Sequence, residues 1–286
     1  MTPGEKLRET WTNVDGLRIF ARVSADAVDI PDRAEPTASP QRDRPFALPS
    51  PRLPLVLVPG LNVSGRHYIR LAQLLSPYLQ VHAPDLPGYG RSSTPRRLLT
   101  LRDLSDTLAA YLRARGIERA AFFGTSFSAQ IVADFAIRHS EHTTHAILAS
   151  PTVDPSSRPL PKLLYRWRVN EHREPPYVGQ VTKRDYQDVS RLRALWTMWL
   201  MIHDHLERRL SQMAPIPTLV VRGGNDPIIT QQWAEKATYL VPRGRLIVIP
   251  GAAHAINRDQ PVRLARVIRA FLCPAYREAA YTSQTP

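Results

Sequence analysis

The sequence predicts an α/β protein, built on a mostly parallel, doubly wound sheet with an inserted helical lid. Short apolar runs of strand length alternate with helix-length amphipathic segments, and this alternation breaks once, between residues 151 and 215, before it resumes. Strands and helices that take turns along a chain form a parallel sheet with crossover helices. An insertion at this position is well placed to cover the carboxyl ends of the strands, where open α/β sheets bind their ligands.

The residues before this alternation divide into two parts. Residues 1–24 are predicted to contribute an N-terminal strand hairpin to the core, because Asp15-Gly16 is a hairpin turn signal between residues that favour strands. Residues 25–53 carry many prolines and scattered charges, a composition that resists both helix and central strand. We interpret them as a long proline-rich connection.

The core is predicted in two parts on either side of the insertion. The first part, residues 54–150, is expected to contain strands at 55–58, 80–83, 120–123 and 146–149 and helices at 101–115 and 127–139. The second part, residues 216–272, is expected to contain strands at 218–222 and 246–249 and helices near 231–239 and 261–271. The insertion, residues 151–215, holds two helical pieces and three of the five tryptophans, and residues 273–286 form a tail.

The formal net charge of +13 comes from arginine, which outnumbers lysine by 34 to 4. Such an excess can indicate a nucleic acid or an anionic membrane as partner. The arginines are spread along the chain among 25 acidic residues and form no dense basic run, so we expect a solvated, arginine-rich surface and no nucleic-acid partner.

The cysteine count and the length of the apolar runs indicate in which cellular compartment the protein is expected. The single cysteine, Cys273, excludes an intramolecular disulfide and a cysteine-cluster metal site. No apolar run is long enough to span a membrane, and the amino-terminal residues lack the apolar core of a secretory signal. We therefore expect a cytoplasmic protein with neither a membrane span nor a metal site.

The first candidate catalytic residue is Ser126, in the run Gly124-Thr125-Ser126-Phe127-Ser128 between a predicted strand and a predicted helix. A serine at such a sharp turn has a strained backbone, and its hydroxyl is exposed above the sheet, which is the geometry of a nucleophile elbow. The usual pattern is G-x-S-x-G, and here Ser128 replaces the final glycine. The alternative is a serine that only caps the helix.

An acid and a histidine follow Ser126, each at the end of a later predicted strand. Asp226 lies in Gly223–Pro227 and His254 ends Gly251–His254, so serine, acid and histidine occur in the chain order that an α/β sheet can bring together. His254 would accept the proton of the Ser126 hydroxyl, and Asp226 would orient the imidazole and stabilise its charged form. The alternatives are a turn-capping aspartate and a loop histidine, with Asp154 as the second choice for the acid.

Two backbone N–H groups are predicted to form an oxyanion hole. Phe127 directly follows the nucleophile, and Leu61 lies in a loop after the first buried strand, where Gly60 allows close approach. Asn62 is either a further side-chain donor that lines the substrate pocket or a turn former. The other residues predicted to line the pocket are Trp196, Trp199 and Ile256, and the alternative for the tryptophans is ordinary packing within the lid.

Together these motifs resemble the α/β-hydrolase superfamily, in its esterase, C–C-bond hydrolase and haloperoxidase-like branch, over about residues 53–272. Residues 85–92 are similar to the D-x-P-G-x-G-x-S loop of that family, and residues 251–261 are similar to its histidine turn. The chain departs from the family at Pro59-Gly60, where His-Gly is usual. The resemblance implies an α/β-hydrolase fold, and the serine nucleophile disfavours the branches that attack through aspartate.

The leading functional hypothesis is hydrolysis of a carboxylic ester, thioester or lactone through an acyl-enzyme on Ser126, without metal or organic cofactor. The expected partner is a small-molecule substrate, an apolar acyl or aryl ester. The same residues allow C–C bond hydrolysis of a diketone-like substrate, a cofactor-free oxygenase, or a non-catalytic ligand-binding protein. The sequence predicts neither the natural substrate nor the oligomeric state.

Overall fold

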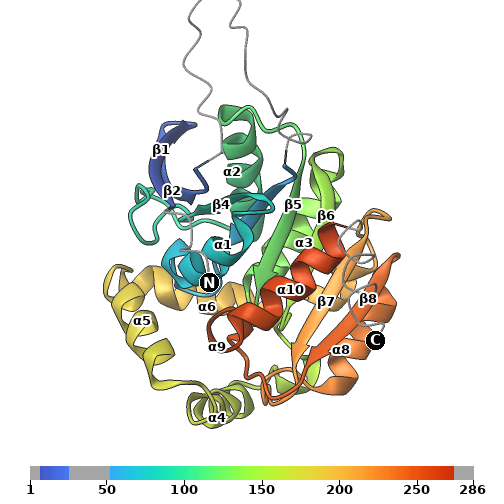
Figure 1. Cartoon of the computed structure of the whole chain (residues 1–286). Helices are drawn as coiled ribbons and strands as arrows, with labels where there is room; N and C mark the ends of the chain where they lie inside the picture. Colours follow the sequence, from blue (N-terminus) through green and yellow to red (C-terminus); the bar gives the residue numbers. More distant parts are fainter. Residues whose placement is uncertain (1–6, 26–51, 274–286) are drawn as a thin grey trace, which may run out of the picture.

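A computed structural model describes residues 7–25 and 52–273 and contains an eight-stranded sheet in the order β1-β2-β4-β3-β5-β6-β7-β8 (Figure 1). The strands are β1 (Arg8–Val14), β2 (Leu17–Val23), β3 (Pro54–Val58), β4 (Gln80–Pro84), β5 (Ala120–Thr125), β6 (Thr143–Ala149), β7 (Thr218–Gly223) and β8 (Gly244–Ile249). From β4 to β8 all neighbouring strands are parallel, which confirms the predicted fold class. Most of the predicted connection and nearly all of the predicted tail lie outside the described residues.

The first two strands form an antiparallel hairpin at one edge of the sheet. Asp15 and Gly16 both have positive φ angles, 47° and 80°, as a two-residue turn between right-twisted strands requires. The hairpin joins the parallel strands through an antiparallel pairing of β2 with β4. The strands therefore lie where the Asp-Gly signal predicts them.

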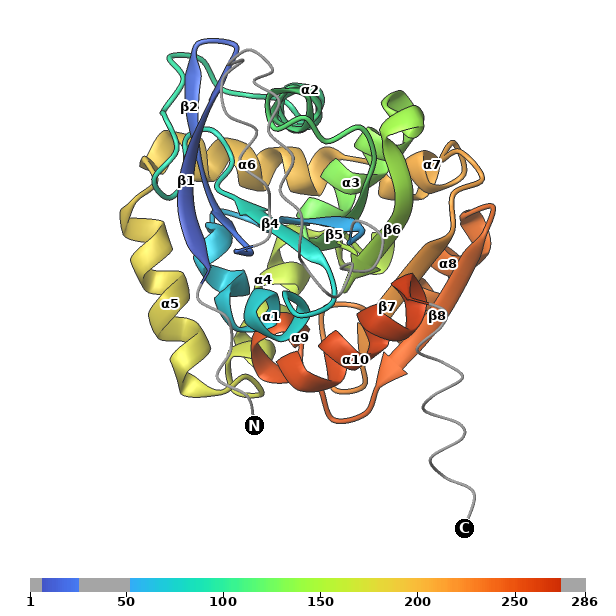
Figure 2. The ribbon, with the colours of Figure 1, turned by 45° about the horizontal axis from the view of Figure 1, so that its top comes forward.

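Helices cover both faces of the parallel strands (Figure 2). One face carries α1 (Ile69–Leu75) and α10 (Pro261–Leu272), and the other carries α2 (Leu101–Ala114), α3 (Ser128–Arg138) and α8 (Gln231–Leu240). Side chains of β3 alternate between the two cores: Val56 and Val58 pack with α2 and α3, whereas Leu55 and Leu57 pack with α1 and α10. Burial on both faces explains why this strand is an uninterrupted apolar run.

An inserted segment, residues 151–215, connects β6 to β7. It contains four α-helices rather than the two helical pieces predicted: α4 (Leu160–Glu171), α5 (Pro176–Gln187), α6 (Arg191–His203) and α7 (Leu206–Leu210). Proline separates α4 from α5, because Pro175 caps α5 and Pro176 begins it without an N–H to donate. Ser190 starts α6, since its side chain accepts a hydrogen bond from the Arg193 N–H.

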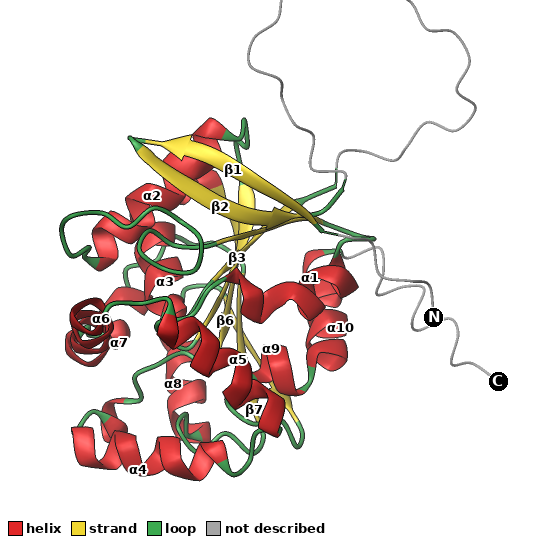
Figure 3. Ribbon diagram, turned by 90° about the vertical axis from the view of Figure 1, so that its left-hand side faces the viewer, coloured by secondary structure: helices red, strands yellow, loops and turns green. Residues whose placement is uncertain are grey.

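The inserted segment lies along one side of the sheet. In Figure 1, α4 and α5 form the lower-left border of the molecule. Figure 3 shows the same segment from that side, with α6 and α7 near α3 and α4 farther down. Its position next to the ends of the parallel strands brings α4 and α5 to the cavity described below.

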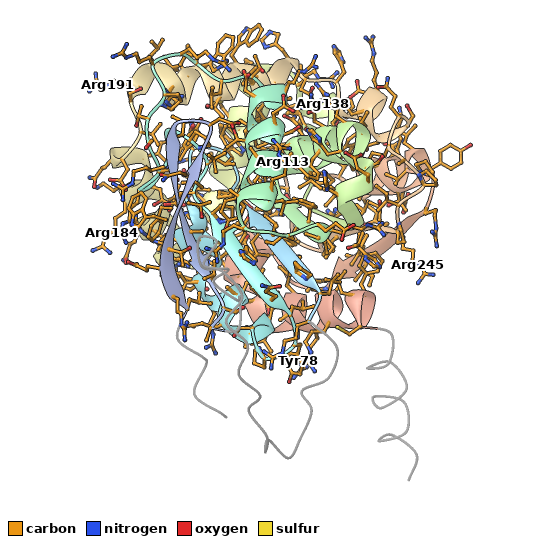
Figure 4. The ribbon with its side chains drawn as sticks, turned by 90° about the horizontal axis from the view of Figure 1, so that it is seen from above. Tyr78, Arg113, Arg138, Arg184, Arg191 and Arg245 are labelled. Carbon is orange, nitrogen blue, oxygen red and sulfur yellow. The ribbon has the colours of Figure 1, made fainter. Side chains whose placement is uncertain are left out.

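Arginine side chains occur on many elements of the surface. Figure 4 labels Arg113 on α2, Arg138 on α3, Arg184 on α5, Arg191 on α6 and Arg245 in β8, at well-separated places around the molecule. The labelled arginines thus follow the scattered distribution in the sequence. Among the described residues, no helix combines the length and the apolar character that crossing a membrane requires.

Candidate active site

Ser126 lies between the end of β5 and the start of α3. Its φ angle is 55°, in the left-handed region that costs a non-glycine residue on the order of 1 kcal/mol. The Ser126 N–H donates to the carbonyl of Ala149 at 2.9 Å, which ties the turn to β6. Gly124 permits the tight return of the helix, because a Cβ atom there would lie 2.6 Å from the carbonyl oxygen of Ser128.

Ser128, which stands where the family pattern has glycine, is fully buried and hydrogen-bonded. Its hydroxyl oxygen accepts from the Thr125 N–H at 2.8 Å, and its hydroxyl group donates to the Val58 carbonyl at 2.7 Å. The substitution therefore links the turn around Ser126 to β3. A glycine would leave the Thr125 N–H and the Val58 carbonyl without these bonds.

The structure brings Ser126, His254 and Asp226 together at the carboxyl ends of β5, β8 and β7. Ser126 Oγ lies 3.0 Å from His254 Nε2, and His254 Nδ1 lies 2.8 Å from Asp226 Oδ2. The other carboxylate oxygen, Asp226 Oδ1, accepts from the N–H groups of Ile228 and Ile229 at 2.8 and 3.1 Å. Each carboxylate oxygen thus has its own hydrogen-bond partners, so the carboxylate cannot rotate without losing these bonds.

Burial and the neighbouring charges shift the pKa values of Asp226 and His254 in opposite directions. Burial alone would raise the pKa of the Asp226 carboxyl, but the charge and hydrogen bond of His254 and the Ile229 N–H hold it below its ordinary value. Burial alone would lower the pKa of His254, but the carboxylates of Asp226 and Glu174 raise it. The site therefore favours an ionised carboxylate and stabilises an imidazolium.

Asp154, the second choice for the acid, is bonded elsewhere. Its Oδ2 accepts from the Thr230 hydroxyl at 2.7 Å, and its Oδ1 accepts from the Ser156 N–H at 2.8 Å. Asp154 caps the short helix η3 (Pro155–Ser157), and Thr230 caps α8. These contacts give Asp154 a structural function between the inserted segment and the core.

The two residues predicted to supply the oxyanion-hole donors are Leu61, in the loop after β3, and Phe127, which directly follows Ser126. Gly60 allows the loop after β3 to approach, since a Cβ atom there would lie 3.2 Å from the Thr125 carbonyl oxygen. Leu61 lines the cavity next to Ser126, whereas the Phe127 side chain is buried in the core and only its backbone faces the turn. Within the described part of the chain, neither the Leu61 N–H nor the Phe127 N–H has a hydrogen-bond acceptor.

A cavity of about 240 Å³ opens above Ser126 and His254. The core contributes Gly60, Leu61, Val63, His67, Tyr68, Thr125, Ile228, Ala255 and Asn257 to its lining. The inserted segment contributes side chains from α4, α5 and the turn between them, namely Trp167, Asn170, Glu171, Glu174, Val178, Thr182 and Tyr186. The lining thus mixes apolar walls with several hydrogen-bonding groups.

Four residues predicted to line the pocket lie outside this cavity lining. Trp196 stacks on Trp199 with ring centroids 5.1 Å apart, and its Nε1–H donates to the Leu99 carbonyl at 2.8 Å. Ile256 is fully buried in the core. Asn62 has a φ angle of 56° and donates to the Ala194 carbonyl at 3.3 Å, so it acts as a turn former that binds α6.

The cavity residues that the sequence did not indicate include polar residues of α4, α5 and the turn between them, such as Asn170, Glu174 and Tyr186. In the sequence of an amphipathic helix, such polar residues indicate a face that is exposed to solvent. Their partners lie in loops more than 80 residues away, as for Asn170 and His254. Among the described residues, no three His, Cys, Asp or Glu side chains are grouped as a metal site would need.

Residues 55–267 match the family described as the alpha/beta hydrolase family, and this match covers most of the chain. The chain belongs to the alpha/beta hydrolase family. Solved structures agree on the fold: a putative lipase from Acinetobacter baumannii AYE superimposes with a TM-score of 0.74 at 15% identity, covering 95% of this chain and 93% of that one.

Three of the proteins similar in sequence come from bacteria. A dihydrolipoyllysine-residue acetyltransferase component of an acetoin cleaving system from Pseudomonas putida is 25% identical over 77% of this chain. The match spans only 63% of that relative's length. A poly(3-hydroxyalkanoate) depolymerase from Ectopseudomonas oleovorans is 26% identical over 77% of this chain and 84% of its own length. Esterase YbfF from Escherichia coli is 24% identical, with coverages of 77% and 92%. The depolymerase and the esterase support ester hydrolysis in broad terms.

Proposed function

We propose that this protein hydrolyses a carboxylic ester, thioester or lactone through an acyl-enzyme on Ser126. The observation that carries the proposal is the chain of two hydrogen bonds from Ser126 Oγ to His254, at 3.0 Å, and from His254 to Asp226, at 2.8 Å. An alcohol becomes an effective nucleophile when a base within hydrogen-bond reach accepts its proton. The second bond selects the histidine tautomer that leaves Nε2 free to act as this base.

In the acylation step, Ser126 Oγ attacks the ester carbonyl carbon while its proton moves to His254 Nε2. The N–H groups of Leu61 and Phe127 are the proposed donors to the oxyanion that forms. The resulting imidazolium then gives its proton to the alkoxide or thiolate as it leaves, and the acyl group stays on Ser126. Water deprotonated by His254 attacks the acyl carbon in the second step, releases the acid and restores the serine.

The cavity supports a small-molecule substrate with an apolar acyl or aryl group. Trp167, Val178 and Ile228 provide apolar wall, and the cavity of about 240 Å³ is below the usual size of drug-binding pockets. The inserted segment supplies Trp167 and Val178, so we propose that it acts as the cap that selects substrates. The tryptophans of α6, Trp196 and Trp199, lie outside this lining.

Labelling with a fluorophosphonate probe tests the nucleophile. The wild type should be labelled once, Ser126→Ala should not be labelled, and Ser211→Ala, which removes an exposed serine of the inserted segment, should be labelled like the wild type. Labelling that persists in Ser126→Ala would overturn the assignment.

Turnover of a panel of p-nitrophenyl esters separates the remaining alternatives. Ester cleavage that depends on Ser126 and accumulates an acylated protein in mass spectra supports the proposal. Labelling without any ester turnover points to the C–C hydrolase alternative. The absence of both labelling and turnover points to a cofactor-free oxygenase or a binding protein.

A further inference from the structure

The end of α4 contacts the loop that carries His254. Asn170 is buried, and its Oδ1 accepts a hydrogen bond from the backbone N–H of His254 at 3.1 Å. The Asn170 carbonyl accepts from the N–H groups of Arg173 and Glu174, at 2.8 and 3.0 Å, which shapes the turn after α4. The inserted segment thereby reaches a backbone group of the proposed catalytic base.

Glu174 makes a second contact with the same loop. Its Oε1 accepts from the Ala255 N–H at 2.9 Å and from the Asn170 side-chain amide at 2.7 Å. The successive N–H groups of His254 and Ala255 therefore donate to the side chains of Asn170 and Glu174, and these two side chains are also hydrogen-bonded to each other. Hydrogen bonds to a carboxylate are among the stronger ones in proteins, so this contact restrains the loop effectively.

The same turn also touches the loop of the acid. Arg173 Nη1 donates to the Asn225 carbonyl at 2.8 Å, one residue before Asp226. Residues 170–174 thus bind the loops of both His254 and Asp226. Relative displacement of the two loops would lengthen the 2.8 Å contact between their side chains.

We propose that Glu174 is a positioning residue for the proposed reaction: with Asn170 it holds the loop of His254, and its charge acts with that of Asp226 to stabilise the imidazolium. This inference rests on the proposed function. It assigns to the inserted segment a part in the chemistry itself, in addition to enclosing the substrate.

Other charged and titratable groups lie on the elements around the His254 loop. They are carried by α4 and its following turn, α5, η1 (Gly65–Tyr68), α9 (Ile256–Asp259) and the loop after β7: Glu171, Arg173, Asp185, Tyr186, Arg66, His67, Arg258, Asp259 and Asp226. Arg66 pairs with Asp185 at 2.6 Å, Glu171 pairs with Arg168 at 3.2 Å, and Asp259 accepts from the Ala253 N–H.

The remaining neighbours do not supply a comparable charge. Burial, together with Arg258 and Arg66, lowers the pKa of His67 to about 3, so this ring is neutral near pH 7. Besides Asp226, the carboxylate that raises the pKa of His254 is Glu174. A change at Glu174 should therefore be visible in the titration of His254.

The expected sign follows from the state that His254 needs. The ring must be neutral to accept the proton of Ser126, so kcat/KM falls as the pH drops through the pKa of His254. Removing the Glu174 charge lowers that pKa and moves the acidic limb of the profile to lower pH. The shift should be about 0.5 pH unit, because Glu174 is only partly buried and solvent screens its charge.

Two variants separate charge from hydrogen bonding. Glu174→Gln keeps an oxygen that can accept from Ala255 and Asn170 and removes only the charge. Asn170→Ala keeps the charge and removes the acceptor of the His254 N–H. Glu171→Gln is the matched control, since it removes a carboxylate from the same cavity wall without contact to the histidine loop.

The experiment measures kcat and KM for p-nitrophenyl acetate between pH 4.5 and 9 on the full chain, with the chosen range spanning the usual titration of histidine. Glu174→Gln should shift the acidic limb downward, and Glu171→Gln should leave the limb in place. Asn170→Ala should lower kcat about tenfold while the limb stays near that of the wild type. Circular dichroism and thermal unfolding establish that each variant folds.

Several results would overturn the inference. They are an unchanged acidic limb in Glu174→Gln, an equal shift in Glu171→Gln, or a wild-type kcat in folded Asn170→Ala. If Glu174→Gln fails to fold, Glu174→Asp serves instead: it retains the charge, so its limb should stay in place while kcat falls, and a wild-type kcat would contradict the positioning role.

A measurement without turnover distinguishes failure of this inference from failure of the proposed function. The ring ¹⁵N signals of His254, assigned with His254→Gln, report its pKa directly by NMR. A lower His254 pKa in Glu174→Gln supports the electrostatic contact even if Ser126 is not labelled by the fluorophosphonate. An unshifted pKa in a protein whose Ser126 is labelled overturns the inference alone.

Discussion

Replacing Asp226 with asparagine should reverse the tautomer of His254. Asp226 Oδ1 accepts two backbone N–H groups, from Ile228 and Ile229, so the amide oxygen of the asparagine must take this place. Its NH₂ group then points at His254 Nδ1, which has to become an acceptor. The ring proton moves to Nε2, and the lone pair that should accept the Ser126 proton is lost.

The magnitude follows from the burial of the pair. The Asp226 side chain is 0% exposed, so its charge is not replaced by solvent. Losing one partner of such a buried pair costs about 3–5 kcal/mol. If this loss falls on the imidazolium formed in the transition state, kcat should decrease by about 10²–10⁴. KM should change little, because the carboxylate does not line the cavity.

The assay compares Asp226→Asn with Asp154→Asn for turnover of p-nitrophenyl acetate. Asp154→Asn removes the charge of a similarly buried carboxylate, and it should lower stability while kcat of the folded protein stays within about threefold of the wild type. The reasoning would be refuted if Asp226→Asn kept more than about a tenth of the wild-type kcat. It would also be refuted if the kcat of folded Asp154→Asn fell by more than about threefold.

Three further predictions concern the framework of the site. Gly124→Ala should lower the free energy of unfolding by about 2–3 kcal/mol in urea titrations, because its Cβ atom would lie 2.6 Å from a carbonyl oxygen. Gly179→Ala on α5 is the control: no atom lies within 4 Å of the added Cβ atom, so this variant should raise the free energy of unfolding by up to about 1 kcal/mol. A neutral result for Gly124→Ala would contradict the close approach of α3. Ser128→Gly should cost about 1–2 kcal/mol, since two buried hydrogen bonds disappear, and wild-type stability would argue against those bonds. Burial lowers the pKa of His82 to about 3, so its folded form stays neutral. The contribution of His82 to stability should be full well above pH 6.5 and about 1.4 kcal/mol smaller at pH 5.5, and His82→Leu should reduce the acid slope of the unfolding curves by this amount, with His67 supplying a similar contribution of its own.

Local patterns were sufficient to predict the mostly parallel sheet. The run Leu55–Val58 is apolar throughout because both of its faces are covered, and such a strand is recognisable without its neighbours. The Asp15-Gly16 turn is equally local, since its positive φ angles depend on those two residues. Both features are expressed in consecutive residues, which is why they were predicted correctly.

The three residues at the strand ends were predicted from chain order. Parallel strands carry their carboxyl ends to one edge, so a serine, an acid and a histidine at three such ends are expected to meet. The structure places Ser126, His254 and Asp226 within hydrogen-bond distance there. The sequence favoured Asp226 over Asp154 as the acid, although both follow a strand. The structure adds a physical difference, because Asp226 contacts His254 whereas Asp154 is bonded to Ser156 and Thr230.

The inserted segment shows what only the tertiary structure decided. Trp196 and Trp199 were predicted to line the pocket because they are aromatic and lie in the insertion, but periodicity does not record which face of a helix meets which neighbour. Trp196 bonds to the Leu99 carbonyl instead, and Asn170 and Glu174 bind the loop of His254.

The sequence by itself thus determined the α/β architecture and the strand ends at which Ser126, Asp226 and His254 lie. The tertiary structure decided which helix faces enclose the cavity and which polar side chains reach the loops of His254 and Asp226. The physical reason is that strands and turns depend on neighbouring residues, whereas the docking of α4 and α5 depends on contacts between segments about 80 residues apart, as between Glu174 and Ala255.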